Sequence, residues 1–324
     1  MKALVTGAGG FGGSHLCEAL IEKGHKVKAF VRYNSRNTWG WLEGSLYKGE
    51  MEIIRGDIRD YDSVKDAAAK NADVIFHLAA LPGIPYSYIS PLANIKTNVE
   101  GTYNVLQAGR ELGVQKIVLA STGEVYGTAQ FVPITEEHPV NPRSPYGATK
   151  AGADFLALSF YRSFDLPVAV IRVFNTYGPR ESARAIIPTV ITQILAGIRK
   201  IKLGSLFPTR DFTYVKDVVE GYVKMAECER CIGDVVNIGS NSETSMGNLV
   251  KLIAKLMATK VHIEVENERE RPPKSEVDRI WADNRKAKEL LGWSPKYTLE
   301  QGLKETIEWF KENLHWYKPE IYNV

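Results

Sequence analysis

Tyr146 and Lys150 stand four residues apart at the start of an expected helix, directly after a proline-rich loop over residues 139–145. Side chains at this spacing lie on one face of a helix. An ammonium group beside a phenol favours the phenolate and lowers the pKa of the tyrosine from about 10 toward neutral pH. The pair could therefore act as a base toward a hydroxyl group.

Two further hydroxyl side chains, Ser121 and Thr122, end an expected strand in the segment Ala120-Ser-Thr-Gly-Glu-Val-Tyr126. Ligands of open α/β sheets bind at the carboxyl ends of the strands. We therefore expect Thr122 and Glu124 to lie in one site with Tyr146.

Three glycines, Gly7, Gly10 and Gly13, follow an expected strand over residues 2–6 and precede a helical stretch over residues 14–23. Glycines at such a turn let the chain close tightly, let backbone N–H groups approach a pyrophosphate and let the helix pack on the sheet. The order is Gly-x-x-Gly-x-x-Gly rather than Gly-x-Gly-x-x-Gly. The turn predicts a dinucleotide site.

The charge at the end of the second expected strand bears on which dinucleotide binds. NAD sites usually place an acid there for the ribose hydroxyl, whereas this chain has Arg32 after Val31. An arginine could bind the 2′-phosphate of NADP, or it could be solvated. Asp57, after the next strand, could accept from adenine or serve as a turn residue. The choice between NAD and NADP stays open.

The expected elements alternate between strand and helix up to about residue 175, which indicates βαβ crossovers and a parallel sheet. We predict an α/β fold: a Rossmann-type doubly wound sheet over residues 1–175, with a smaller, discontinuous substrate-binding domain over residues 176–324. Residues 211–238 could return to the main sheet. The strands are expected at residues 2–6, 26–31, 52–55, 73–78, 116–120 and 168–173. The helices are expected at 14–23, 63–70, 98–112, 148–164, 186–197, 215–227, 247–258 and 284–313.

Composition excludes several classes of protein. The 324 residues include 41 Lys and Arg against 38 Asp and Glu, so no strong field would attract nucleic acid or a membrane. Three cysteines favour a reducing cytoplasm over a disulfide-bonded setting, and no apolar run approaches the roughly 20 residues that span a bilayer. Cys228 and Cys231 have zinc-ligand spacing but no second pair nearby, so we expect no metal.

With these residues in view, the chain resembles the extended short-chain dehydrogenase/reductase superfamily, and within it the enzymes that modify nucleotide sugars. The motifs run nearly end to end: Thr6-Gly-Ala-Gly-Gly-Phe11, Gly56-Asp57, His77-Leu-Ala-Ala80, Asn98-Val-Glu-Gly-Thr102, Ser121 to Gly127, Tyr146 to Lys150, Arg172-Val-Phe-Asn175, Tyr177-Gly-Pro-Arg180, Arg210-Asp-Phe212 and Asp217.

The resemblance implies a role for each matching residue. Tyr146 would be the base, Lys150 would hold the nicotinamide ribose with support from Asn98, and Thr122 would bind O4 of the sugar. Contacts to a tightly bound, recycled NAD(P) are implied for Gly7, Gly10, Phe11, Gly13, Arg32, Asp57, Ile58, Leu78, Ala79, Ala80, Asn98, Tyr146 and Lys150. Contacts to the substrate are implied for Thr122, Asn175, Arg180, Pro188, Arg210 and Arg271, with Arg210 and Arg271 gripping the diphosphate.

Glu124 distinguishes among the reactions of these enzymes. Once C4 of the sugar is a ketone, a carboxylate can remove the acidified C5 hydrogen while the C6 hydroxyl leaves as water. The resemblance implies such a 4,6-dehydration, because the related 4-epimerases typically lack this glutamate. Dehydratases of dTDP-glucose carry an Asp before the Glu, whereas this chain has Gly123. Either Glu124 makes both proton transfers, or another group or water makes one.

Three other segments, residues 33–43, 83–91 and 182–188, resemble bacterial dehydratases of UDP- or GDP-N-acetylglucosamine on routes to legionaminic-type sugars, which are described as NAD-dependent. A homodimer through helices at 98–112 and 148–164 is implied as well. UDP-glucuronate decarboxylase, a nucleotide-sugar 4-epimerase and a non-catalytic NAD(P)-binding sensor are the alternatives. The nucleotide base, the C2 substituent and the C5 stereochemistry stay open.

Overall fold

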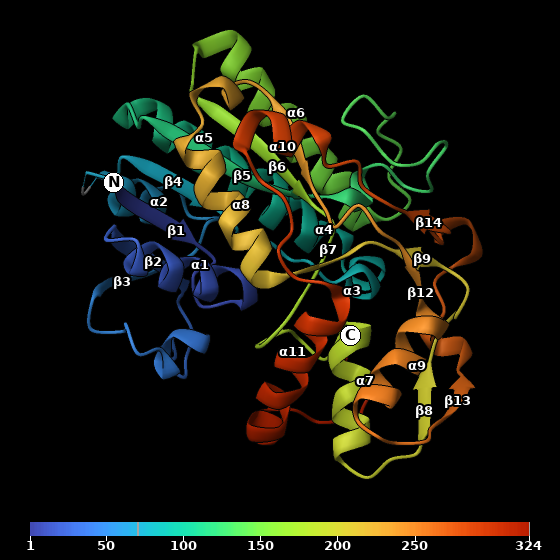
Figure 1. Cartoon of the computed structure of the whole chain (residues 1–324). Helices are drawn as coiled ribbons and strands as arrows, with labels where there is room; N and C mark the ends of the chain where they lie inside the picture. Colours follow the sequence, from blue (N-terminus) through green and yellow to red (C-terminus); the bar gives the residue numbers. More distant parts are fainter. Residues whose placement is uncertain (70, 324) are drawn as a thin grey trace.

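The computed structural model of the protein describes residues 1–69 and 71–323. Lys70 and Val324, which end the second expected helix and the second expected domain, lie outside these residues. Among the described residues, seven parallel strands form one sheet in the order β11-β6-β5-β4-β1-β2-β3 (Figure 1). The strands are β1 (Lys2–Thr6), β2 (Lys26–Arg32), β3 (Met51–Gly56), β4 (Val74–His77), β5 (Lys116–Thr122), β6 (Val168–Val173) and β11 (Val235–Ile238). The predicted Rossmann-type α/β fold is confirmed.

Helices cover both faces of this sheet. Helices α1 (Phe11–Glu22) and α8 (Val215–Glu227) pack together on one face, with α10 (Arg285–Leu291) beside β11. The other face is covered by α2 (Tyr61–Ala69), α5 (Gly101–Leu112) and α6 (Pro145–Phe164). Both faces are thus buried, as the nearly continuous apolar runs of these parallel strands require.

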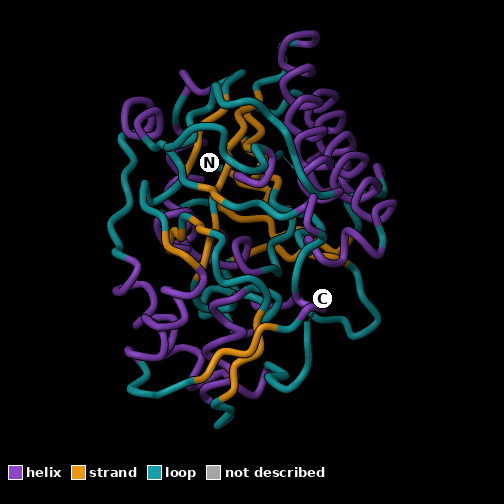
Figure 2. The backbone as a smooth tube through the Cα atoms, turned by 90° about the vertical axis from the view of Figure 1, so that its right-hand side faces the viewer, coloured by secondary structure: helices purple, strands orange, loops and turns teal. Residues whose placement is uncertain are grey.

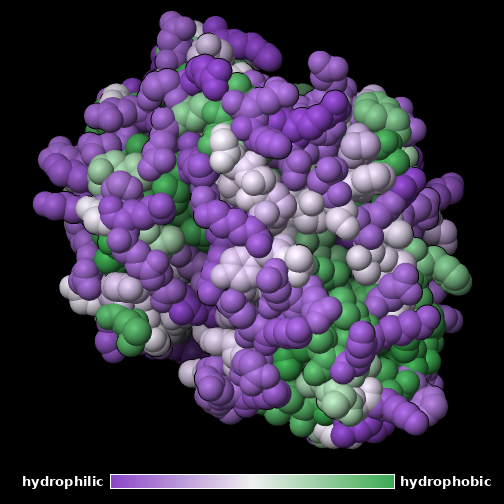
Figure 3. Space-filling model, viewed as in Figure 1, coloured by the Kyte–Doolittle hydropathy of each residue, from purple (hydrophilic) through white to green (hydrophobic). Residues whose placement is uncertain are grey.

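A smaller lobe lies beyond the carboxyl ends of the strands (Figures 1 and 2). It contains α7 (Ile186–Leu195), α9 (Met246–Leu256), α11 (Leu299–Asn313) and the parallel pair β8 (Lys200–Leu203) and β13 (His262–Val265). A short sheet of β9 (Thr209–Arg210), β12 (Thr244–Ser245) and β14 (Arg279–Ile280) joins it. Figure 3 shows apolar side chains gathered over this lobe, in the area of α7 and α9, whereas the surface over the large sheet is mainly polar.

The chain enters this lobe after β6 and returns to the large sheet through α8 and β11, which pairs in parallel with β6. The short strands β7 (Asn175–Tyr177) and β10 (Phe212–Tyr214) pair where the chain leaves and re-enters. The helical region expected at residues 284–313 consists of two helices, because Gly292 adopts the left-handed conformation that ends α10 and Pro295 follows. Two short helices, α3 (Ile84–Ile89) and α4 (Pro91–Asn94), and a π-helical segment, Ile95–Glu100, precede α5.

Candidate active site

The glycine turn between β1 and α1 forms one end of a cavity of about 1560 Å³. Gly7 has a φ of +72°, and a Cβ atom there would lie 2.8 Å from the backbone nitrogen of Ala79. A Cβ on Gly13 would overlap the carbonyl oxygen of Gly7. Gly10 is the N-cap residue of α1 and provides no side-chain cap, so the first N–H groups of the helix are free to bind a ligand. The turn therefore fits the pyrophosphate of a dinucleotide.

Charged side chains at the end of β2 and just after β3 line the same cavity as the glycine turn. Arg32 is exposed at the end of β2 and lines the cavity together with Asp57 and Ile58. Asp57 is held by Arg59, whose Nη2 lies 2.6 Å from Oδ2 and whose Nε lies 3.0 Å from Oδ1. These hydrogen bonds lower the pKa of Asp57 below its usual range. Arg59, which sequence reasoning missed, adds a second positive charge beside Arg32.

The remaining residues predicted to contact the dinucleotide lie mostly on the same cavity wall. Phe11, Leu78, Ala79 and Ala80 line it. Asn98 is buried in the π-helical segment, and its side chain bonds to the backbone of Leu81 and to Thr149 Oγ1 rather than to Lys150.

Thr122, Tyr146 and Lys150 line the middle of the cavity, where β5 ends and α6 begins. Ser144 caps α6 through the N–H of Gly147, and Pro145 occupies its first turn, which fixes the start of the helix two residues before Gly147. The Lys150 ammonium donates a hydrogen bond of 2.6 Å to the carbonyl oxygen of Ala120. Burial lowers the pKa of Lys150 to about 8.

The pKa of Tyr146 differs from the expectation based on its spacing from Lys150. Burial raises this pKa, and the nearby Glu124 carboxylate raises it further, whereas hydrogen bonding to Thr122 has the opposite effect. The predicted lowering is therefore wrong for this structure, because desolvation of the phenolate exceeds the stabilisation that its surroundings provide.

Glu124 is 9% exposed and joins the two arginines predicted to grip a diphosphate. Its Oε2 lies 3.5 Å from Nη1 of Arg271, and its Oε1 lies 4.0 Å from Nε of Arg210. Glu276, which sequence reasoning missed, bridges the same arginines at 3.6 Å to Arg210 and 3.9 Å to Arg271. Two carboxylates and two guanidinium groups thus meet beside the end of β5.

Gly123, which precedes Glu124, packs against an aromatic side chain. A Cβ atom there would lie 3.1 Å from the ring of Phe174, so this ring occupies the space that a side chain at this position would need. The glycine therefore belongs to the local packing and adds no proton donor to the site.

The other residues predicted to bind the substrate have different surroundings. Asn175 lines the cavity at the start of β7, whereas Pro188 is buried within α7 and does not line it. Arg180 also lines the cavity, but its guanidinium forms two hydrogen bonds to the Glu18 carboxylate, at 2.9 and 3.0 Å, and one to Ser14. This pairing ties the segment after β7 to α1.

Aromatic side chains connect the segment after β2 with the carboxyl-terminal part of the described chain. The Trp41 ring lies 5.4 Å from Trp309 and 6.2 Å from Trp316 in edge-to-face geometry, and it stacks on Tyr317. Trp41, Trp316 and Tyr317 all line the cavity. The Trp41 segment therefore packs against the chain end and covers part of the site, which sequence spacing could not reveal.

Other side chains that could do chemistry or bind a metal are not part of this site. His77 is buried between the hydroxyls of Thr6 and Thr102, and burial lowers its pKa to about 3. Within residues 1–69 and 71–323 no cluster of three or more His, Cys, Asp or Glu side chains could hold a metal ion. In the same part of the chain, no helix is both long enough and apolar enough to cross a membrane.

The fold and the site define an extended short-chain dehydrogenase/reductase. Residues 4–306 match the model of the GDP-mannose 4,6-dehydratase family, and the chain belongs to this family. The chain is 33% identical over 315 residues to a putative UDP-glucose 4-epimerase from Methanocaldococcus jannaschii, covering 96% of this chain and 98% of the relative. It is 32% identical over 323 residues to a dTDP-glucose 4,6-dehydratase from Streptomyces antibioticus, covering 98% and 95%.

Solved structures with the same fold include nucleotide-sugar enzymes. A dTDP-glucose 4,6-dehydratase from Bacillus anthracis in complex with NAD has a TM-score of 0.88 at 30% identity, covering 98% of this chain and 99% of that chain. A UDP-glucose 4-epimerase from Thermotoga maritima with UDP-glucose has a TM-score of 0.87 at 31% identity, covering 97% and 100%. The resemblance to nucleotide-sugar enzymes is thus confirmed at the level of the family.

Proposed function

We propose that the protein is an NAD(P)-dependent nucleotide-sugar 4,6-dehydratase that converts UDP- or GDP-N-acetylglucosamine to the 4-keto-6-deoxy sugar. The observation that carries this proposal is the buried Glu124 carboxylate, in the same cavity as Thr122, Tyr146 and Lys150. A carboxylate at this place serves an elimination, which a simple epimerisation at C4 does not need.

The cofactor would lie along the glycine turn, with its pyrophosphate at the start of α1 and its nicotinamide end toward Tyr146 and Lys150. No side chain fits at Gly7 or Gly13, so the turn closes tightly and exposes its backbone N–H groups to a pyrophosphate. When bound, the dinucleotide would supply an acceptor and then a donor for the hydride of C4.

The chain's own groups position the sugar and move its protons. Thr122 and Tyr146 hold O4, and Tyr146 takes the O4 proton when it is in its phenolate form. Lys150, one turn further along α6, would hold the nicotinamide ribose of the bound cofactor. Because burial raises the pKa of Tyr146, we expect turnover to increase with pH over the neutral range.

Glu124 would make both proton transfers of the elimination. Its carboxylate removes the hydrogen from C5 of the 4-keto sugar as the C5–C6 double bond forms and the C6–O bond breaks. The same proton then passes from Glu124 to the leaving hydroxyl, which departs as water, so the elimination needs no other acid. A proton from solvent would then be added at C5 when hydride is added at C6, which completes the 4-keto-6-deoxy sugar. Gly123 supports this assignment because it has no side chain to supply a second proton.

The test is incubation with a panel of UDP-, GDP- and dTDP-sugars in heavy water. A dehydratase yields a product lighter by one water, with deuterium at C5. Conversion without solvent hydrogen at C5 would exclude the proposal, and carbon dioxide release from UDP-glucuronate would identify a decarboxylase instead. A C4-inverted product indicates an epimerase, and absence of turnover across the panel supports a sensor.

A matched pair of variants assigns the base. Glu124→Gln should still reduce the cofactor but lose water elimination by at least about a hundredfold. Glu276→Gln, which alters a carboxylate bound to the same two arginines, should raise KM and still eliminate water. Full dehydration by Glu124→Gln would show that another group is the base.

We further propose that the protein is a homodimer that pairs α5 and α6 with their copies. Tyr103 on α5 and Phe155 and Phe164 on α6 are exposed, between 44% and 56% of their surfaces. Apolar side chains on helices that already pack together favour a helical interface. Light scattering should give twice the chain mass, and Phe155→Glu should shift the protein toward the monomer.

A further inference from the structure

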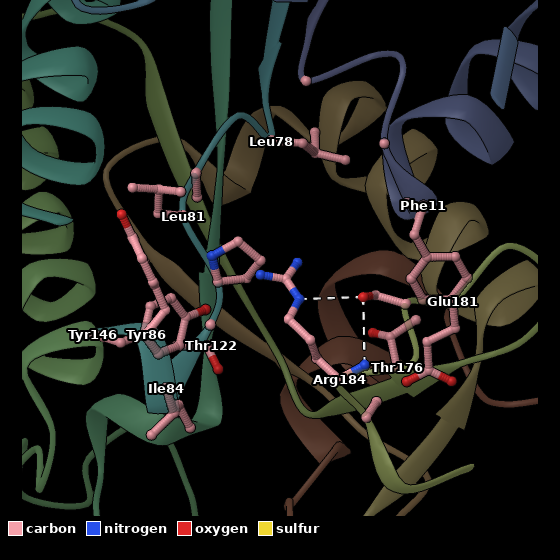
Figure 4. Close-up of a pocket in the computed structure, with 18 of the residues that line it drawn as sticks. Phe11, Leu78, Leu81, Ile84, Tyr86, Thr122, Tyr146, Thr176, Glu181 and Arg184 are labelled. Atoms are coloured by element: carbon pink, nitrogen blue, oxygen red, sulfur yellow. Dashed lines mark hydrogen bonds between the residues drawn. The ribbon is translucent and has the colours of Figure 1, made fainter. Parts of the chain in front are cut away.

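Arg184 places a guanidinium group inside the cavity that none of the roles above uses. It extends from the segment after β7 into the space between the glycine turn and the Tyr146 wall (Figure 4). A Cβ atom on Gly83 would lie 3.1 Å from its Nη1, so the group reaches the loop that follows β4. Burial lowers the pKa of this guanidinium, although the side chain stays accessible from the cavity.

Arg184 differs from Arg180, Arg210 and Arg271 in having donors without a protein partner. Arg180 is paired with Glu18, and Arg210 and Arg271 are paired with carboxylates. Within the described part of the chain, the guanidinium of Arg184 bonds through Nε to Ser182 Oγ at 3.2 Å, and no carboxylate lies within 4 Å of it. Nη1 and Nη2 are therefore free to bind an acceptor on a ligand.

Glu181, three residues earlier, does not neutralise this charge. Its carboxyl is buried, and in the described residues its Oε2 has no hydrogen-bond partner. Burial raises its pKa well above the usual range, which favours the neutral acid. The positive charge of Arg184 thus faces the cavity unopposed.

The position of Arg184 relative to the catalytic groups indicates which part of the sugar it faces. With O4 on Tyr146 and with C5 and C6 toward Glu124, a pyranose ring presents C3 and C2 to the remaining wall. Figure 4 shows Arg184 between Thr176 and Glu181 on one side and Leu81, Ile84 and Tyr86, from the loop after β4 and from α3, on the other, and its Nη1 reaches Gly83 of that loop. Leu81 and Ile84 are apolar, so a hydrogen-bond donor and an apolar surface lie next to each other.

An acetamido group matches this pairing, because it combines a strong carbonyl acceptor with a methyl group. A hydroxyl at C2 would accept a hydrogen bond but would leave the apolar surface uncovered. We infer that Arg184 determines specificity by donating to the carbonyl oxygen of an acetamido group on C2 of the substrate, with the methyl group against Leu81 and Ile84. This inference rests on the proposed function and adds to it the residue, Arg184, that recognises the substituent on C2.

The test compares UDP-N-acetylglucosamine with UDP-glucose, and the two GDP-sugars in parallel, in wild type, Arg184→Gln and Arg184→Lys. Affinities are measured by calorimetry and turnover by mass spectrometry, so that binding is scored even where no product forms. Arg36→Gln, at an exposed position that does not line the cavity, is the matched control. A hydrogen bond from a charged donor predicts a 10- to 100-fold loss of affinity and of kcat/KM for the acetylated sugar in Arg184→Gln.

The loss should appear mainly in Kd and KM, stay below about threefold for UDP-glucose, and be partly restored in Arg184→Lys. Equal losses for both sugars would overturn the inference in favour of a structural or cofactor-binding role. A selective loss for UDP-glucuronate would overturn it as well, because the group would then face C6. Absence of a dehydrated product from wild type with an intact affinity ratio would refute the proposed function and leave the role of Arg184 standing.

Discussion

Replacing Lys150 by methionine is expected to stabilise the fold while abolishing turnover. Lys150 is buried, and its ordinary pKa of 10.5 is lowered to about 8. At neutral pH the native protein therefore carries a desolvated ammonium group that the unfolded chain would solvate freely. This difference in pKa corresponds to about 3 kcal/mol of destabilisation.

The substitution also removes the hydrogen bond from the charged Lys150 ammonium to the carbonyl oxygen of Ala120, worth about 1.5 kcal/mol. Methionine is unbranched and fills much of the same space. The net gain is therefore about 1.5 kcal/mol. With an unfolding entropy of roughly 2 cal/mol/K for each of the 324 residues, this gain raises Tm by about 2 °C.

The stability difference between Lys150→Met and the wild type should depend on pH in a defined way. Because the folded pKa lies below the unfolded one, the unfolded chain binds more protons between pH 8 and 10.5, and the wild type gains stability as the pH rises through this window. The advantage of Lys150→Met should be complete below about pH 8 and should vanish toward pH 10.5.

Thermal unfolding of nucleotide-stripped protein, followed by circular dichroism at several pH values, measures this difference. Lys251→Met, at an exposed position on α9, is the control and should change Tm by less than about 1 °C. A Lys150→Met variant that is no more stable than wild type at pH 7, or a difference that stays constant up to pH 10.5, would refute the reasoning.

Three more changes test other parts of the molecule. In the wild type, Nε of Arg172 lies 2.9 Å from Oδ2 of the buried Asp154. Arg172→Met removes this counter-ion and should lower the free energy of unfolding by about 3–5 kcal/mol, measured by chemical denaturation. Gly13→Ala would press a methyl group against a carbonyl oxygen of the glycine turn and should weaken NAD(P) binding at least about tenfold, measured by fluorescence titration. Gly12→Ala is the control and should leave binding unchanged, because its Cβ would make only an ordinary contact at 3.8 Å. Arg32→Ala should weaken binding of NADP and leave that of NAD within about twofold; equal effects on both would show that this side chain reads no 2′-phosphate.

Local sequence accounts for most of the large sheet. The strands at residues 2–6 and 168–173 appear at their expected bounds, since each is a short apolar run bordered by polar or glycine-rich segments. The helix that contains the Tyr146 motif begins at Pro145, three residues before the expected start at residue 148, because Ser144 caps it and Pro145 suits its first turn. Its spacing also places Tyr146 and Lys150 on one helix face, because helical geometry depends only on separation along the chain.

The pairing of the predicted carboxylate with its arginines depended on tertiary structure. Glu124 meets Arg271 across 147 positions of sequence, through a lobe whose strands β8 and β13 have no local signal strong enough to predict them. The raised pKa of Tyr146 likewise follows from burial, which no spacing of residues reports.

The sequence by itself determined the alternation of elements, the glycine turn and the helical Tyr146 motif, because each is encoded within about ten neighbouring residues. Only the tertiary structure brought Arg184 to the loop after β4 and Trp41 against Trp309, since such contacts depend on how distant segments fill space together. The residues proposed to do the chemistry could therefore be identified from the sequence, whereas the surroundings that select the substrate and set the pKa values arise from packing.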